Sequence, residues 1–307
     1  MTRVAAIDCG TNTIKLLVAD LDQATGVAVE HSRQMRMVRL GQGVDRTGHF
    51  AEQALERVFA AIDEYAAIID GLQVGATRFC ATSAARDASN ADVFVRGVEQ
   101  RLGVVPEVLT GDEEAQLSYD GATRALTGRE HRAPFLVVDI GGGSTELILG
   151  DGRGHVRAAR SLDIGSVRMT ERHLHSDPAT EQQIAETMAA IDATLDGCDV
   201  PLQQAATVVG VAGTITTVAA GVLDLPEYDR DAIDHAVIRL VGIDELTRSF
   251  LTMSTAERAT LPYMHPGRAD VIGAGALILD RVLRRTSVES LLVSEADILD
   301  GIAWSIA

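Results

Sequence analysis

The sequence predicts an α/β fold of two similar domains, each a mixed sheet with flanking helices, that face a central cleft. The first observation is residues 135–149, where a short apolar run ends at Asp139, three glycines and two hydroxyl residues follow, and a second apolar run begins. Both runs are rich in Val, Leu and Ile and bounded by glycine, which is typical of two strands joined by a tight turn. The second observation is that residues 4–18 align with this stretch without a gap, Asp8 on Asp139, at an offset of 131 residues. Such a repeat indicates a duplicated domain.

The glycine-rich turn after Asp139 is suited to binding phosphate. Glycines let the backbone turn tightly and leave its N–H groups uncovered, which makes a concavity for phosphate oxygens. The turn is not a Walker loop, because no Gly-Lys-Ser/Thr follows and the chain leaves as a strand. Without a lysine in this turn, Asp139 would repel a bound phosphate unless a divalent cation lay between them. The pattern predicts phosphate with magnesium, and an ordinary glycine-rich hairpin is the alternative.

The chain is strongly acidic, with a formal net charge of −17 from 44 acidic and 27 basic residues. This balance argues against nucleic acid and anionic membranes as partners. It also opposes a polyanionic substrate, but salt screens charges over about 8 Å, so the residues that line a cleft control what binds there. A hydrophobic content of 46% in 307 residues suits two globular domains.

The sequence predicts a cytoplasmic protein. No apolar run approaches the ~18 residues that span a bilayer, and Asp8 comes too early for a signal peptide. Three cysteines without metal-ligand spacing favour a reducing compartment. Cys9 and Cys80 lie in apolar, strand-like runs and are expected in the core.

Periodicity and turn residues place the remaining elements. Leu55, Val58 and Ile62 fall at three- and four-residue steps, which predicts a helix over 52–70. Asp177-Pro178 has the form of a helix cap and first turn, and the helix is expected to end near Leu195. The other expected elements are strands at 27–40, 76–82, 104–109, 157–164, 206–209 and 287–293, helices at 91–102, 215–221, 271–283 and 298–306, and a loop at 262–268.

Several basic residues are candidates for phosphate contact. Arg86 follows a strand end, where a guanidinium can hold a phosphate by two hydrogen bonds. Arg168 stands near an expected helix start, where a structural role is equally reasonable. Arg33, Arg36 and Arg39 recur at three-residue steps, and a solvated strand face is favoured over a cleft lining.

Three other patterns differ in the chemistry that they indicate. Gly213 and Thr214 begin a helix after a buried strand, an arrangement that offers N–H groups and a favourable dipole end to an anion. Glu113 fits as a dipole partner in a first helical turn. His173 and His175 have no carboxylate or cysteine at ligand spacing, so no metal site is expected there.

Four motifs occur in order: Asp-x-Gly-Thr-Asn-Thr at 8–13, Gly-Asp-Glu-Glu-Ala at 111–115, Asp-Ile-Gly-Gly-Gly-Ser-Thr-Glu at 139–146 and Gly-Val-Ala-Gly-Thr at 210–214. Together they resemble the exopolyphosphatase and guanosine pentaphosphate phosphohydrolase family of the actin-like and sugar-kinase superfamily, in a short form. The resemblance implies two ribonuclease-H-like (actin-like ATPase) domains, at 1–127 and 128–297. It also implies that the terminal helix at 298–307 packs on the first domain. The stretch at 128–134 is polar and contains proline, which favours a crossing between the domains there.

The resemblance further implies the site. Glu114 matches the family's base that activates water, and Arg86 matches a family arginine. Asp139, Glu146 and Asp8 are the expected metal ligands for Mg²⁺, with Mn²⁺ as the alternative ion. The expected phosphate-binding residues are Thr11, Asn12, Thr13, Gly141, Gly142, Gly143, Ser144, Thr145, Gly213 and Thr214. The family often has Ser-Asp-x-x-x-x-Glu-Gly near the end, whereas this chain has Ser294-Glu295 and Asp300-Gly301.

The combined expectation is a magnesium-dependent exopolyphosphatase that removes terminal phosphates from inorganic polyphosphate and prefers short chains. Guanosine pentaphosphate is the alternative substrate, and a homodimer is a candidate assembly. Two other classes stay open. Acceptor-dependent ATP consumption would favour a kinase-like phosphotransferase, and tight binding without turnover would favour a polyphosphate or nucleotide sensor.

Overall fold

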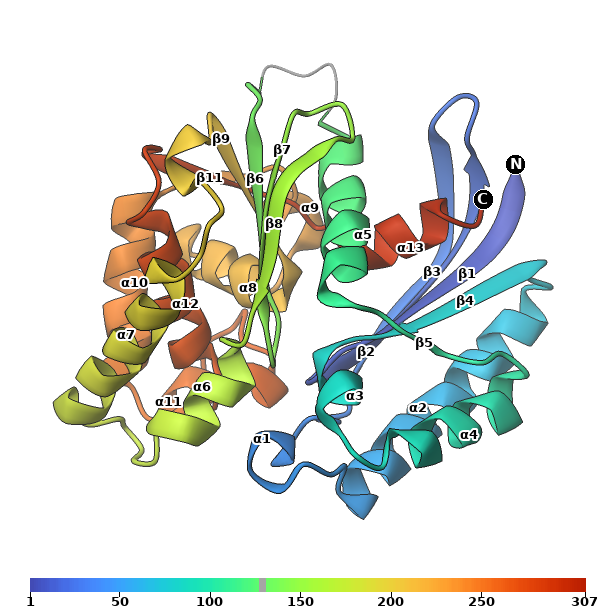
Figure 1. The fold of residues 1–307 in the computed structure, drawn as a ribbon, viewed down its shortest axis with the longest axis horizontal. Helices are drawn as coiled ribbons and strands as arrows, with labels where there is room; N and C mark the ends of the chain where they lie inside the picture. The colour runs from blue at the N-terminus through green and yellow to red at the C-terminus, as the bar shows by residue number, and fades with distance from the viewer. Residues whose placement is uncertain (127–130) are drawn as a thin grey trace. The chain divides into compact units, whose positions relative to one another are not determined.

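The computed structural model describes residues 1–126 and 131–307. They form two compact units, Met1–Gly121 with Ile298–Ala307 and Ala122–Asp297 (Figure 1). The last helix, α13 (Ile298–Trp304), therefore belongs to the first unit. The crossing expected at 128–134 begins in residues 127–130, which lie outside the described residues.

The first unit contains a five-stranded mixed sheet in the order β3-β2-β1-β4-β5. Its strands are β1 (Thr2–Cys9), β2 (Thr13–Asp22), β3 (Val27–Met37), β4 (Ala76–Ala81) and β5 (Glu107–Val108). The first three are antiparallel neighbours, whereas β4 and β5 run parallel to β1. The strand predicted at 104–109 is wrong in extent, because only Glu107 and Val108 pair with β4.

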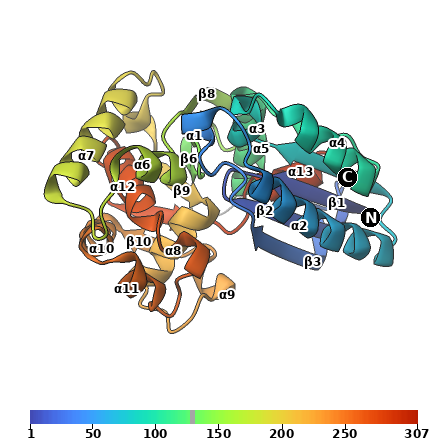
Figure 2. The same ribbon diagram turned by 90° about the horizontal axis from the view of Figure 1, so that it is seen from below.

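Side chains of β1 alternate between two cores. One face packs with α2 (Glu52–Gly71) and α4 (Ala91–Leu102), and the opposite face packs with α13 (Figure 1, Figure 2). The face toward α2 and α4 carries Ala5, Ile7 and Cys9. The face toward α13 carries Val4 and Ala6. Because successive strand residues point to opposite faces, Asp8 lies on the α13 side. Cys9 and Cys80 are both buried, which confirms their expected core positions.

The second unit contains a six-stranded sheet in the order β10-β11-β9-β6-β7-β8. Its strands are β6 (Phe135–Ile140), β7 (Thr145–Gly150), β8 (Val156–Leu162), β9 (Thr207–Val211), β10 (Val237–Arg239) and β11 (Ser290–Val293). Strands β8, β7 and β6 are antiparallel neighbours, while β9 and β11 run parallel to β6. The topology of the first sheet is thus repeated, with β10 added at the edge. The predicted fold class of two mixed-sheet α/β domains is confirmed, and the cleft between them stays a prediction.

One large core lies between this sheet and the helices that cover one of its faces. These helices include α6 (Ser166–His173), α7 (Glu181–Asp196), α8 (Ala212–Val222), α10 (Leu240–Thr252) and α12 (Ile272–Leu283). The remaining helical elements are α1 (Val44–Thr47), α3 (Ser83–Asp87), α5 (Gly111–Arg124), η1 (Leu202–Gln204), α9 (Arg230–Ile233), α11 (Thr255–Ala259) and η2 (Pro266–Arg268). The predicted elements did not include α1, α3, η1, α9, β10, α10, α11 or η2. Helix α10 was detectable, because Ile243, Phe250 and Leu251 fall at helical spacing and are buried.

The start predicted for α7 at Asp177-Pro178 is wrong. Thr180 caps the helix, with its side chain accepting from Gln183 N while the Gln183 side chain accepts from Thr180 N. This reciprocal pair satisfies two N–H groups that a helix end leaves without partners. Asp177 instead accepts a hydrogen bond from Thr255 N at 2.7 Å and so ties the start of α11 to the segment before α7.

The arginines of β3 form ion pairs on the first sheet. Arg33 lies 2.6 Å from Asp300 of α13 and 2.8 Å from Glu30, and Arg36 lies 2.9 Å from Glu64. Asp300, at the acidic position where this chain departs from the family motif, therefore has a structural partner within the first unit.

Asp192 joins α7 to α12. It accepts from Arg281 Nε at 2.8 Å and from Arg285 Nη1 at 2.9 Å, and these bonds, that from Arg281 foremost, lower the pKa of its carboxyl. Asp192→Asn is expected to lower the free energy of unfolding at pH 7 by about 1–2 kcal/mol, because charge-assisted hydrogen bonds are lost. Since folding lowers this pKa, the stabilisation is complete above the ordinary Asp value of about 3.9 and disappears as pH falls through the lowered value.

Urea unfolding at pH 7 and pH 3 checks this expectation. The difference between wild type and Asp192→Asn should shrink at pH 3. A difference that stays constant or grows on acidification would contradict a stabilising role for the ionised carboxylate.

Candidate active site

The two predicted hairpins have the same register. Asp8 on β1 faces Lys15 on β2, and Asp139 on β6 faces Glu146 on β7. Lys15 therefore occupies in the first hairpin the position that Glu146 occupies in the second, and its Nζ lies 3.8 Å from Asp8 Oδ2. Lys15 was not among the predicted site residues, although the gap-free alignment of the two copies places it opposite Asp8, an expected metal ligand.

Both turns are closed in the same way by one backbone hydrogen bond. The bonds run from Gly10 N to Thr13 O at 2.9 Å and from Gly141 N to Ser144 O at 3.0 Å. Thr13, predicted as a phosphate-binding residue, already belongs to β2, where it is the register partner of Met37.

The first turn has occupied carbonyls and unused donors. Thr11 O accepts from Gly41 N at 2.8 Å, and Asn12 O accepts from Val38 N at 3.0 Å and Arg39 N at 2.9 Å. In residues 1–126 and 131–307, no hydrogen bond uses the N–H groups of Thr11 and Asn12 or the Asn12 side chain. These donors are therefore available to an anion.

The two residues predicted to be catalytic are in contact within the first unit. Arg86 of α3 donates through Nη1 to Glu114 Oε2 at 2.7 Å and to Leu109 O at 2.8 Å. Glu114 of α5 is 7% exposed. Over the described chain, Arg86 Nε and Nη2 make no hydrogen bond, so the guanidinium holds the carboxylate through Nη1 and keeps the three N–H donors of Nε and Nη2 for a ligand. Asp8 lies on the sheet face where Leu117 of α5 packs, and Glu114 precedes Leu117 by three residues, about one turn, on that helix.

The second turn, where β6 turns into β7, lies at the end of the sheet near α6 (Figure 1). Carbonyls of this turn accept hydrogen bonds from backbone N–H groups at the start of α6. The backbone bonds are Ser166 N to Gly141 O at 2.9 Å, Val167 N to Gly142 O at 2.9 Å and Arg168 N to Gly142 O at 3.0 Å. Gly165 sits against the Gly142 carbonyl so closely that a Cβ has no room. In the part of the chain that the structure describes, the N–H groups of Gly142, Gly143 and Ser144 make no hydrogen bond.

The predicted hydroxyl ligands differ in what they already bond. The Thr11 hydroxyl shares a hydrogen bond with Ser83 at 3.0 Å. The Thr145 hydroxyl donates to Ile164 O at 2.5 Å, so its proton is already committed. The Ser144 hydroxyl has no hydrogen bond among the described residues.

Carboxylates and a hydroxyl line up across three strands of the second unit. Asp139 and Glu146 are cross-strand neighbours, both at most 7% exposed, and Ser161 on β8 donates to Glu146 Oε1 at 2.7 Å. Cross-strand neighbours lie on the same sheet face, so the two carboxylates are adjacent. No group of three or more His, Cys, Asp or Glu residues able to hold a metal occurs among residues 1–126 and 131–307. A carboxylate pair still fits Mg²⁺, which proteins commonly bind through one or two carboxylates, with substrate phosphates and water completing the coordination.

The third predicted loop begins α8. Ala212 has φ of 68°, a left-handed conformation that costs a non-glycine residue about 1–3 kcal/mol and tends to occur at functional sites. The guanidinium of Arg268 fills the space beside Gly213, and its Nη1 donates to Thr217 Oγ1 at 3.1 Å. Thr214 is buried. Arg268, which the sequence placed only in a loop, is therefore a basic group at this helix start.

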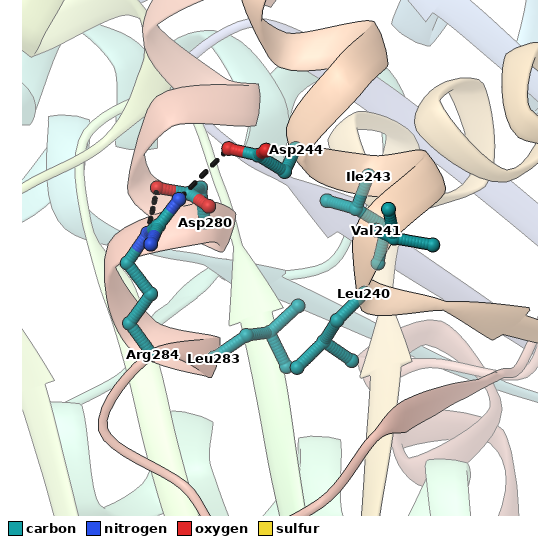
Figure 3. A pocket seen from close by; sticks show the side chains of 7 residues that line it. All are labelled: Leu240, Val241, Ile243, Asp244, Asp280, Leu283 and Arg284. Atoms are coloured by element: carbon teal, nitrogen blue, oxygen red, sulfur yellow. Dashed lines mark hydrogen bonds and ion pairs between the residues drawn. The ribbon is translucent and has the colours of Figure 1, made fainter.

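A cavity of about 220 Å³ elsewhere in the second unit contains none of the predicted residues (Figure 3). Its walls are Leu240, Val241, Ile243, Asp244, Asp280, Leu283 and Arg284. Arg284 lies 2.8 Å from both Asp280 and Asp244, so its charge is already neutralised. This cavity is poorly suited to phosphate.

Comparison with known proteins places the chain among phosphatases. Residues 22–307 match the Ppx/GppA phosphatase family, a span that starts after the first turn. Exopolyphosphatase 2 of Mycobacterium tuberculosis is 45% identical, with 100% of this chain and 99% of that protein aligned. None of the described helices is long and apolar enough to cross a membrane.

Solved structures agree with this assignment. An exopolyphosphatase-like protein is 42% identical with a TM-score of 0.95, covering 100% of this chain and 98% of that one. The Ppx/GppA family member of Aquifex aeolicus is 31% identical with a TM-score of 0.83, covering 99% of this chain and 97% of that one.

Proposed function

This chain belongs to the Ppx/GppA phosphatase family, and from that premise we propose that it is a magnesium-dependent exopolyphosphatase acting on inorganic polyphosphate. Family membership confirms the predicted enzyme class, a phosphoanhydride hydrolase. The observation that carries the proposal is that both hairpin turns present unused backbone N–H groups next to a buried aspartate, Asp8 or Asp139. The name of the Mycobacterium tuberculosis relative supports polyphosphate as the substrate.

Phosphate is held mainly by backbone donors in this proposal. The second turn offers the N–H groups of Gly142, Gly143 and Ser144, and the first offers those of Thr11 and Asn12. Fixed backbone dipoles suit a phosphoryl group because they need no reorganisation when charge develops. The start of α8 at Gly213 and Thr214 adds a third set.

Asp139 and Glu146 are the proposed ligands of Mg²⁺ or Mn²⁺, with Asp8 as the corresponding carboxylate of the first unit. When bound, the ion would neutralise charge on the phosphoryl oxygens. Ser161 fixes one oxygen of Glu146, which holds the carboxylate in one orientation.

Glu114 is the proposed general base. It accepts a proton from water while the water oxygen forms a bond to the terminal phosphorus and the phosphoanhydride P–O bond breaks. The products are orthophosphate and a polyphosphate chain shorter by one phosphate. Arg86 positions Glu114 through Nη1 and offers its other N–H groups to phosphate oxygens.

Short polyphosphate chains are expected to be the better substrates. The donors identified above bind only a few phosphates, and the net charge of −17 repels polymer that extends beyond them. Phosphate release measured as kcat/KM per chain end, over polyphosphates of defined length, should reach a plateau after a few phosphates. A kcat/KM that keeps rising until chains reach on the order of hundreds of phosphates would contradict this expectation.

The same assay separates the competing functions. Guanosine pentaphosphate and ATP are run beside the polyphosphates. A clear preference for guanosine pentaphosphate would replace the proposed substrate. ATP consumption that depends on an added acceptor would indicate a phosphotransferase, and tight binding of polyphosphate without release of phosphate would indicate a sensor.

A further inference from the structure

The carbonyls of the second turn determine where its N–H groups point. In a planar trans peptide, the carbonyl of one residue and the N–H of the next point in opposite directions. Because Gly141 O and Gly142 O accept from α6, the N–H groups of Gly142 and Gly143 point away from α6. The hydrogen bonds from α6 to the turn carbonyls therefore set the direction of the predicted phosphate donors, which lie on the opposite side of the turn.

The peptide after Gly143 depends on a side chain. Arg168 Nε donates to Gly143 O at 2.6 Å, and over residues 1–126 and 131–307 no backbone N–H bonds to that carbonyl. Arg168 is only 9% exposed and also lies 3.9 Å from Asp163. The Ser144 N–H, on the opposite side of this peptide, is thereby directed away from Arg168.

The first turn is supported in a similar way, but the supporting side chain acts through a neighbouring segment and does not bond the turn itself. The N–H groups of Val38 and Arg39 hold Asn12 O. Arg57 of α2 fixes that segment, because its Nε donates to Val38 O at 2.7 Å and its Nη2 donates to Gln42 Oε1 at 3.4 Å. Arg39 adopts a left-handed φ of 48°, a conformation that surrounding contacts must maintain.

We propose that Arg168 and Arg57 are positioning residues that orient the peptide planes of the two phosphate turns, Arg168 directly and Arg57 through the segment 38–42. Neither role requires the side chain to touch the substrate. The expected consequence for phosphate rests on the proposed function, whereas the expected change in turn geometry does not. The effect of Arg168 is larger, because its side chain bonds the turn itself.

The test compares Arg168→Met, Arg168→Lys and Arg57→Met with wild type and with the matched control Arg160→Met. Arg160 lies on β8 in the same unit as Arg168, pairs with exposed Asp199, and gives the same change in charge. The binding probe is tripolyphosphate, measured by calorimetry. Backbone ¹⁵N NMR follows the amide resonances of Gly143 and Ser144.

Arg168→Met is expected to raise KM and the tripolyphosphate Kd about 10-fold or more with kcat changed less than about threefold, because binding donors are misaligned in ground and transition states alike. Arg168→Lys should recover part of the loss, Arg57→Met should give a smaller rise, and Arg160→Met should give none. The Ser144 amide resonance should shift in Arg168→Met without ligand.

Each result bears on a separate claim. Unchanged Kd and unchanged amide resonances in folded Arg168→Met would overturn the positioning role. A wild-type protein that neither binds nor hydrolyses polyphosphate would overturn the proposed function, and the amide shift would still report on the turn. If Arg168→Met does not fold, Arg168→Lys and Arg57→Met carry the comparison together, and wild-type Kd and wild-type amide resonances in both variants would overturn the inference.

Discussion

Glu114→Gln is expected to lower kcat by about 10²–10⁴-fold, the contribution typical of a positioned general base. The amide is almost the same size as the carboxylate and can still accept from Arg86, so the fold and polyphosphate binding should be retained. Phosphate release measures kcat, and thermal unfolding with tripolyphosphate calorimetry checks that the variant is folded and binds.

Glu113→Gln is the matched control, one residue away on the same helix. Its carboxylate accepts from Thr110 N at 2.9 Å and Thr110 Oγ1 at 2.8 Å, which lowers the pKa of the Glu113 carboxyl and occupies it in capping α5. This variant should keep kcat within about threefold of wild type, because the group acts on the helix end and not on water. Loss of activity in Glu113→Gln with retention in Glu114→Gln would move the base to Glu113.

Removal of divalent cations is expected to abolish activity, and added Mg²⁺ should restore it. The second turn carries Asp139 and Glu146 but no lysine, so phosphate binding there needs a counter-charge. Asp139→Asn should raise the Mg²⁺ concentration for half-maximal activity about 10–100-fold, the size of change that altered metal surroundings produce. Titration of Mn²⁺ followed by electron paramagnetic resonance gives a readout that does not depend on turnover.

Asp199→Asn is the control for this loss of charge, because Asp199 lies in the same unit but pairs with Arg160 on the surface. Its Mg²⁺ requirement should match that of wild type. Full activity after exhaustive chelation would refute the metal role, and equal Mn²⁺ affinity in Asp139→Asn and wild type would remove Asp139 from the ligand set.

The sequence by itself determined the parts of this protein that depend on neighbouring residues. An apolar run, an aspartate, small residues and a second apolar run specify a strand–turn–strand hairpin wherever they occur, so both hairpins and the duplication were predicted. The helix at 52–70 followed from its apolar stripe in the same way. The Glu114 motif was recognised from a contiguous stretch, residues 111–115.

The tertiary structure decided which groups meet across the chain. Ser161 on Glu146, Arg168 on Gly143 and Arg268 beside Gly213 join residues of different elements. Ser161 and Arg268 were absent from the predicted site, and the sequence left Arg168 open between phosphate contact and a structural role. No local period marks such partners, because a side chain is selected by the space and the polar atoms left open when distant elements pack. The same reason explains Asp177, whose local pattern predicted a helix cap but whose carboxylate bonds Thr255 of a distant helix. Local composition fixed the hairpins, and packing between distant elements fixed the direction in which their peptide groups point.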